Sequence, residues 1–357
     1  MPKGVREVDY TDRNEPISFP LLMLTDVHVQ RPSCSVTCAP PAMTESHFVH
    51  PLCPLSPHVR HSLVDAKSST ELCEALIHVV LGWFSFYQAG YLHRDISIRT
   101  VFLCPSPVEQ RAFEISADFH QTATKSVEDL TLLLKGVSVD ECSYQLNDIE
   151  EKIMRVEQLV QELGVTTTCS AFIIDSDMAI PWETCLDSGR DNQEILGNPE
   201  FVSSKLAQSI ERNSDYLQSP VDDLFSVYWV ALWAILNNIP TSRRSDDELW
   251  WRKKIAEGRR FRDDASVDIC RLSPREWKSQ SPIVQQWSPV LDSWFQSLDR
   301  LDKDWRRAAD PPDDVKVENS RDFYLPLFHY FALRGVADFL EVIKSHYTQL
   351  CNYLPFA

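Results

Sequence analysis

Glycine is scarce in this chain, and the scarcity limits the folds that the chain can adopt. Nine of the 357 residues are glycine, whereas average usage of about 7% would give almost three times as many. Loops that bring the backbone close to a phosphate need closely spaced glycines. No two glycines here have the spacing of G-x-G-x-x-G or of G-x-x-x-x-G-K-[ST]. The sequence therefore excludes a Rossmann dinucleotide site and a P-loop.

Charge and hydropathy predict a soluble protein with no membrane segment. The formal net charge of −17 argues against general binding to nucleic acid or to anionic membranes. The longest apolar stretches, 75–87 and 227–236, are interrupted or too short to span a bilayer, and the N-terminus lacks the apolar core of a signal peptide. Ten cysteines without a C-x-x-C pair indicate reduced thiols and an intracellular location, cytoplasmic or nuclear.

Residues 1–62 differ in composition from the rest of the chain. They hold nine of the 22 prolines, which remove backbone donors and break helices. We expect an irregular proline- and cysteine-rich segment in which only Ile17–Asp26 could form a strand. A zinc site in this segment is an alternative, although the spacing of its cysteines and histidines matches no common finger. Its candidate ligands are Cys34, Cys38, His47, His50, Cys53, His58 and His61.

Residues 63–350 predict a mainly helical domain that begins with a strong helix. Ser68 and Glu71 form a capping box, apolar residues follow at helical spacing, and Gly90 stands where a C-cap belongs. A loop and a short apolar strand are expected over 91–104. A second short strand is expected over Ala171–Ile174.

The rest of this domain is also predicted to be helical. Polar, helix-forming sequence fills 105–169, which we interpret as a helical insertion on the surface. A buried helix begins at Ser219 and Pro220, an N-cap followed by a proline at the first helical position. A final amphipathic helix is expected around 324–347.

Four motifs occur in order along this domain. They read HRDISIRT at 93–100 (the HRD loop), IDSDMA at 174–179, GNPEFVS at 197–203 and DDLFSVYWVALW at 222–233. They resemble the patterns H-R-D-I-S-x-x-N, I-D-F-D-L-A, G-T-x-x-F-M-[SA] and D-D-L-E-S-x-x-Y/W-V-L-L-W of the fungal-type protein kinase family. The resemblance covers roughly residues 60–350. It implies an α+β, protein-kinase-like fold with a mainly helical C-lobe and a truncated or absent N-lobe sheet.

The resemblance implies roles for three residues of the HRD loop. Asp95 matches the aspartate that orients the substrate hydroxyl and accepts its proton. His93 and Arg94 match the residues that brace this loop. If the chain is active, its cofactors are expected to be ATP and Mg²⁺.

Further roles follow from the other motifs. Asp175 matches the aspartate that holds Mg²⁺ between the phosphates, and Thr100 stands at the position of the second, asparagine ligand. Asp223 matches a buried helix aspartate that anchors the HRD loop, although adjacent Asp222 leaves that register open.

The chain departs from the family pattern at several positions. Thr100 replaces the asparagine with a shorter and weaker ligand, Ser176 replaces the phenylalanine after the metal aspartate, and Lys205 stands near the glutamate that usually closes the activation segment. Only Lys3 and Lys67 precede the HRD loop, and neither lies in a V-A-I-K-like strand. The glycine-rich loop and the strand lysine that hold ATP are therefore missing from the sequence.

These departures favour a pseudokinase that binds a protein partner through its C-lobe. The alternatives are an active serine/threonine-type protein kinase acting on a protein substrate, or a truncated fragment of one. Aromatic and basic residues mix over 250–262, as on a nucleic-acid surface, but interleaved acids favour pairing along helix faces. We expect no specific nucleic-acid partner and no membrane association.

Overall fold

The computed structural model describes residues 61–133, 148–165, 167–188, 197–257, 259–310 and 320–351. The chain divides into two compact units, 1–55 and 56–357. Residues 1–60 of the proline-rich segment lie outside the described residues. They include Ile17–Asp26, which could be a strand left from an N-lobe, and every candidate zinc ligand except His61. His61 and Ser62, the last residues of the predicted irregular segment, pair with a strand of the second unit.

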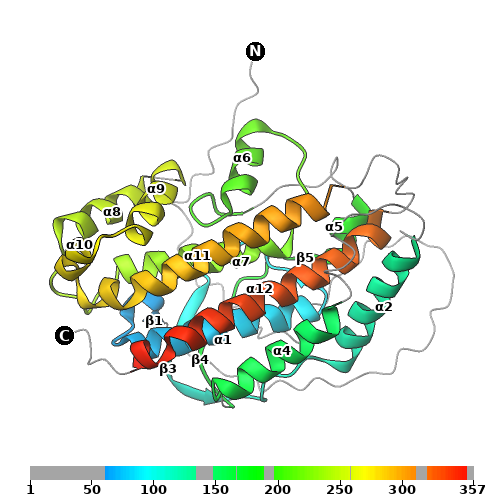
Figure 1. The fold of residues 1–357 in the computed structure, drawn as a ribbon, viewed down its shortest axis with the longest axis horizontal. Helices are drawn as coiled ribbons and strands as arrows, with labels where there is room; N and C mark the ends of the chain where they lie inside the picture. Colours follow the sequence, from blue (N-terminus) through cyan, green and yellow to red (C-terminus); the bar gives the residue numbers. More distant parts are fainter. Residues whose placement is uncertain are drawn as a thin grey trace, which may run out of the picture. The chain divides into compact units, whose positions relative to one another are not determined.

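The described residues are mostly helical with two small antiparallel sheets, which is the predicted α+β class (Figure 1). Helix α1 (Ser69–Gln88) begins as predicted, since the Ser68 side chain accepts a hydrogen bond from the Glu71 N–H at 3.1 Å. Gly90 follows its end with a φ of 101°, a conformation that residues with a Cβ seldom adopt. This turn leads directly into β2 (Tyr91–Leu92).

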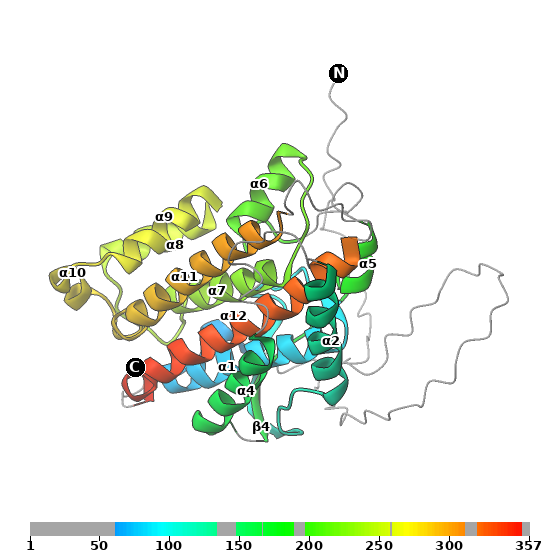
Figure 2. The same cartoon turned by 45° about the vertical axis from the view of Figure 1, so that its right-hand side comes forward.

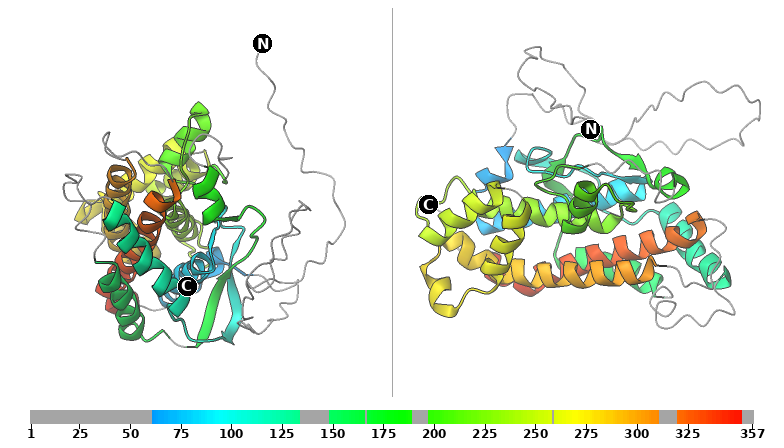
Figure 3. Two further views of the ribbon diagram at one scale, coloured as in Figure 1. Left: turned by 90° about the vertical axis from the view of Figure 1, so that its right-hand side faces the viewer. Right: turned by 90° about the horizontal axis from the view of Figure 1, so that it is seen from above.

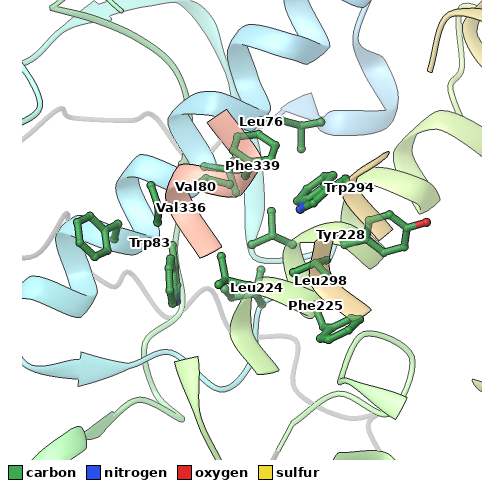
Figure 4. Packing of buried hydrophobic residues seen from close by; sticks show 14 of the residues in the cluster. Leu76, Val80, Trp83, Leu224, Phe225, Tyr228, Trp294, Leu298, Val336 and Phe339 are labelled. Carbon is green, nitrogen blue, oxygen red and sulfur yellow. The ribbon is translucent and has the colours of Figure 1, made fainter. Parts of the chain in front are cut away.

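Helices α1, α7 (Pro220–Leu236), α11 (Pro282–Ala308) and α12 (Ser320–Cys351) form the core of the second unit. α11 and α12 run side by side in Figures 1 and 2. Aromatic and aliphatic side chains from all four helices interdigitate at their centre, including Trp83, Leu224, Trp294 and Phe339 (Figure 4). Each of these four side chains is at most 1% exposed, so their burial contributes on the order of 2 kcal/mol apiece.

The strands join the HRD loop to the segment that contains Asp175. In the three-stranded sheet, β3 (Val101–Glu109) pairs with β1 (His61–Ser62) on one side and with β4 (Thr168–Ile173) on the other. β3 and β4 run alongside each other in Figure 3. In the second sheet, β2 pairs with β5 (Ile180–Pro181). β3 therefore leaves the HRD loop directly, and β4 returns the chain to Asp175.

The predicted helical insertion contains α2 (Ala117–Leu133) and α4 (Ile149–Glu162). Both helices pack against α12 (Figure 2), and their apolar faces join the core. Salt bridges fix α4 along the rim of this contact, from Arg155 to Glu341 and from Lys344 to Glu162, each at 2.8 Å. β3 and β4 extend into the predicted insertion, so its helical part begins at Ala117.

Shorter helices complete the second unit. They are η1 (Leu63–Asp65), α5 (Trp182–Ser188), α6 (Ser204–Arg212), α8 (Asp246–Ala256), α9 (Arg259–Cys270) and α10 (Pro274–Ser279). Basic residues of α8 pair within the protein, as expected for a solvated helix face: Lys253 and Lys254 both lie within 4.0 Å of Glu257. None of the helices that the structure describes combines the length and the apolar character needed to cross a membrane.

Candidate functional site

The carboxylate of Asp223, in the first turn of α7, receives three hydrogen bonds. The backbone N–H groups of His93 and Arg94 donate to it at 2.9 Å each, and the indole N–H of Trp83 on α1 donates at 3.0 Å. Asp223 is 2% exposed, and a buried charge of this kind is stable only when such donors surround it. One side chain therefore joins two helices to the start of the HRD loop.

Asp222, the neighbouring carboxylate on α7, bonds to a different loop. It accepts hydrogen bonds from the hydroxyl of Ser203 at 2.6 Å, the hydroxyl of Tyr216 at 2.8 Å and the backbone N–H of Ser219 at 2.8 Å. Ser203 is the N-cap of α6. Burial raises the pKa of Asp222 to about 6, although these donors favour its ionised form.

The imidazole of His93 connects the HRD loop to the segment that contains Asp175. It hydrogen-bonds to the backbone carbonyl of Ile174, the residue before Asp175. Burial lowers the pKa of His93, while the neighbouring charges of Asp223, Asp95 and Asp175 oppose that shift. The hydrogen bond of His93 therefore links the two segments. The fold thus brings all three predicted aspartates around one side chain.

Asp95 is half-buried at the edge of this cluster. Burial raises its pKa; His93 lowers it, and the nearby carboxylate of Asp175 raises it. The backbone N–H of Asn198 also hydrogen-bonds to the Asp95 carboxylate. A carboxylate with a raised pKa, close to a second carboxylate, has the electrostatic environment of a general base.

Backbone strain is concentrated at the same residues. Among the described non-glycine residues, only three have positive φ, and two of these are Arg94 at 69° and Asp175 at 67°. Such conformations cost of order 1 kcal/mol or more and persist where surrounding contacts enforce them. For Arg94 those contacts are the backbone bond to Asp223 and a side-chain bond from its Nε to Gln218 at 2.9 Å. Asp175 itself is exposed.

Gly197 brings a second loop close to the HRD loop. A Cβ at this position would lie 2.4 Å from Val202 and 3.0 Å from the carbonyl oxygen of Arg94. Its φ is 147°, so any other residue would also strain the backbone. Gly197 therefore permits the contact that places Asn198 beside Asp95.

Thr100 closes the HRD loop from inside. Its hydroxyl accepts a hydrogen bond from the Ser97 N–H at 2.9 Å, and it lies 3.2 Å and 3.1 Å from the carbonyl oxygens of Asp95 and Ser97, to which it donates. The residue is 3% exposed. These contacts use the single proton of the hydroxyl and one of the two lone pairs of its oxygen. The predicted role of Thr100 as a metal ligand remains a prediction.

Of the residues predicted to hold Mg²⁺, the described structure presents one carboxylate to solvent, that of Asp175. Mg²⁺ requires octahedral oxygen ligands and is usually held by one or two carboxylates plus the phosphates of a nucleotide. Asp175 supplies one exposed carboxylate, but the hydroxyl of Thr100 is directed to the loop backbone. No group of three or more histidine, cysteine, aspartate or glutamate side chains within the described ranges could hold a metal ion.

Arg262 on α9 is a residue whose position the sequence did not reveal. Its guanidinium donates hydrogen bonds to the carbonyls of Glu200 and Val202, at 2.6 and 3.1 Å, and stacks 3.9 Å above the ring of Trp229. It thereby holds the segment that precedes α6. Lys205, near the position of the family's glutamate, lies in the first turn of α6. The sequence showed only a basic run, and no local signal separated this buried arginine from its solvated neighbours.

A family model described as fungal protein kinase matches residues 49–235, just over half of the 357 residues. The chain belongs to the fungal protein kinase family. No curated protein and no solved structure matched the chain.

All four motifs of this fungal protein kinase chain fall inside the matched residues. The match ends at the last turn of α7, so α8 to α12 lie beyond it. The predicted site residues are therefore supplied by the matched part, while α11 and α12 contribute to the core against which that part packs.

Proposed function

We propose that this chain is a degenerate fungal protein kinase, with a kinase-like C-lobe, that binds a protein partner and does not transfer phosphate. The observation that carries the proposal is the state of Thr100. Its hydroxyl stands where the family has an asparagine, and the backbone of its own loop takes the hydroxyl proton and one of the two oxygen lone pairs. ATP and Mg²⁺ are not expected as cofactors of this function.

Phosphoryl transfer depends on positioning and on neutralising phosphate charge, for which protein kinases use two metal ligands from the C-lobe. An asparagine reaches further than threonine and offers a carbonyl oxygen. Ser176, next to Asp175, also cannot supply the packing of the family's phenylalanine. Both changes weaken the metal-binding half of the site, while the Asp223 contacts keep the loop itself in shape.

An active protein kinase is the second candidate, and the surroundings of Asp95 favour it. The raised pKa of this half-buried carboxylate suits a general base. The nearby Asp175, held at positive φ, presents an exposed carboxylate to solvent. These features would be retained in an enzyme that obtains its nucleotide-binding half in an unusual way.

Mg·ATP binding and phosphate transfer to a generic protein substrate would distinguish the two candidates. We expect the full chain to show no thermal shift with millimolar Mg·ATP and no transfer of labelled phosphate. Transfer that disappears in both Asp95→Asn and Asp175→Asn, but persists in the exposed control Asp177→Asn, would overturn the proposal. Thr100→Asn tests its physical basis, since it restores the family's amide and is expected to increase Mg²⁺-dependent ATP binding over the unmodified chain.

A further inference from the structure

Two cysteines meet across the hairpin that joins the HRD loop to Asp175. Cys104 lies on β3, just after the HRD loop, and Cys169 lies on β4, shortly before Asp175. The Cys104 thiol donates a hydrogen bond to the Cys169 sulfur, and both thiols are in the reduced form. The Cys169 thiol in turn donates to the backbone carbonyl of Ala171 at 2.8 Å. None of the contacts described for the predicted site uses either thiol.

A bulge in β3 makes this contact geometrically feasible. Leu103 pairs with Ala171, but the next registered pair is Val108 with Cys169, so residues 104–107 lie opposite a single residue of β4. Two prolines fall in this stretch, and proline has no N–H to donate to the ladder. In an unbroken ladder the two cysteines would point to opposite faces of the hairpin. The bulge therefore allows two thiols that a regular register would separate to come together.

The two thiols differ in accessibility and in acidity. Cys104 is partly exposed, whereas Cys169 is 4% exposed. The hydrogen bond from Cys104 lowers the pKa of the Cys169 thiol and outweighs the opposing effect of burial. By contrast, burial raises the pKa of both Cys73 and Cys270. The pair thus combines an accessible sulfur with a neighbouring sulfur whose pKa is lowered, as in reactive thiol pairs.

We propose that Cys104 and Cys169 form a reversible disulfide when the protein is exposed to a hydroperoxide. The accessible sulfur of Cys104 attacks the peroxide and gives up its proton, its S–O bond forms as the O–O bond breaks, and the remaining peroxide oxygen takes a proton and leaves as water or an alcohol. The Cys169 thiolate then attacks this sulfur, the S–S bond forms, and the hydroxyl leaves as water. Two thiols and one hydrogen peroxide give one disulfide and two waters, with two electrons passing from sulfur to oxygen.

The disulfide would close residues 105–168 into a covalent loop that contains α2 and α4. It would also tie β3 to β4 at the bulge, where the ladder has no registered pair between Leu103 and Val108. Linking chain segments this far apart restricts the unfolded chain more than the folded one. We therefore expect the oxidised protein to melt about 5 °C higher than the reduced protein.

Peptide mapping of the peroxide-treated full chain under non-reducing conditions tests the proposal. Trypsin leaves Cys104 as the single cysteine of peptide 100–111, and it leaves Cys169 with Cys185 in peptide 156–190. We expect these peptides to be joined with the loss of two hydrogens, fragment ions to place the link at Cys169, and dithiothreitol to separate them. The link should persist in Cys185→Ser and be absent in Cys169→Ser, together with the rise in melting temperature.

Met154 provides an internal control for the dose of peroxide. This residue is 60% exposed, and peroxide oxidises an exposed methionine to the sulfoxide. The proposal is wrong if Met154 is oxidised while both thiols remain reduced. It is also wrong if Cys104 is recovered as a sulfinic acid or joined to another cysteine. Loss of the disulfide link in Cys185→Ser would also contradict the proposal.

Discussion

Replacing Asp223 with asparagine is the sharpest test of how the site is held together. The carboxylate accepts three hydrogen bonds, from Trp83, His93 and Arg94, at 2.9 to 3.0 Å. The asparagine side chain is nearly identical in size, but an NH₂ group replaces one of the two oxygens and faces a buried N–H donor. The substitution therefore changes the hydrogen bonding and leaves the packing volume almost the same.

The expected loss of stability follows from those three bonds. A hydrogen bond to a charged group contributes about 1.5–3 kcal/mol, against about 0.5–1.5 kcal/mol for a neutral one. Losing one bond and neutralising the other two adds up to roughly 4 kcal/mol, and the reduced cost of burying a charge offsets a part of it. We expect Asp223→Asn to lower the free energy of unfolding by about 3 kcal/mol.

Urea denaturation followed by circular dichroism measures this difference, with the exposed Asp177→Asn as the control. Hydrogen exchange adds a local measurement, because the amides of His93 and Arg94 should exchange faster in Asp223→Asn than in the control. A loss below 1 kcal/mol, or unchanged exchange at these two amides, would refute the idea that Asp223 fixes the HRD loop.

Three further predictions concern other parts of the structure. Burial lowers the pKa of His329 to about 3. Below about pH 6.5 this histidine takes up a proton in the unfolded chain but not in the folded protein, so the free energy of unfolding falls as the pH drops towards 3. The expected loss at pH 5 is about 2 kcal/mol. Unfolding curves at pH 7.5 and pH 5 should show this loss, and His329→Gln should reduce it; equal pH dependence in both proteins would contradict the assignment. Gly197→Ala should lower the free energy of unfolding by about 3 kcal/mol in urea denaturation, since the added Cβ would overlap Val202 and strain the backbone. Gly82→Ala, whose Cβ would have no atom within 4 Å, should leave this free energy unchanged or raise it by up to about 1 kcal/mol. Arg262→Lys should lower the free energy of unfolding by about 2 kcal/mol, because a lysine cannot donate to two carbonyls in the same plane. Limited proteolysis should cut this variant near Val202 faster than the exposed control Arg271→Lys. Similar cleavage rates in the two variants would rule out a bracing role for the guanidinium.

The sequence was sufficient where local signals determine structure. Ser68 and Gly90 carry the start and the end of α1 in their capping chemistry, and Ser219 with Pro220 does the same for the start of α7. These signals depend on neighbouring residues and therefore need no knowledge of the tertiary fold. The α+β class and the membership of the family followed from the order of such elements and motifs.

The rest depended on contacts between distant parts of the chain. Trp83 was one of the apolar residues at helical spacing after Ser68, and its indole bond to Asp223 links positions 140 residues apart. In the sequence Arg262 is one basic residue in a run of basic residues, and only the position of α9 in the fold shows that its guanidinium lies over Trp229. Thr100 could be recognised as a substitution from the sequence, but the capture of its hydroxyl by the loop backbone follows from the conformation of that loop.

The two adjacent aspartates of α7 anchor both loops of the site to the same helix. Asp223 holds the HRD loop and Asp222 holds the N-cap of α6, so the anchors of both loops are separated by a single peptide unit. A tilt or slide of α7 would carry both loops together and leave their spacing nearly unchanged. The alignment of the two loops therefore depends on α7 and not on the length of the chain that lies between them.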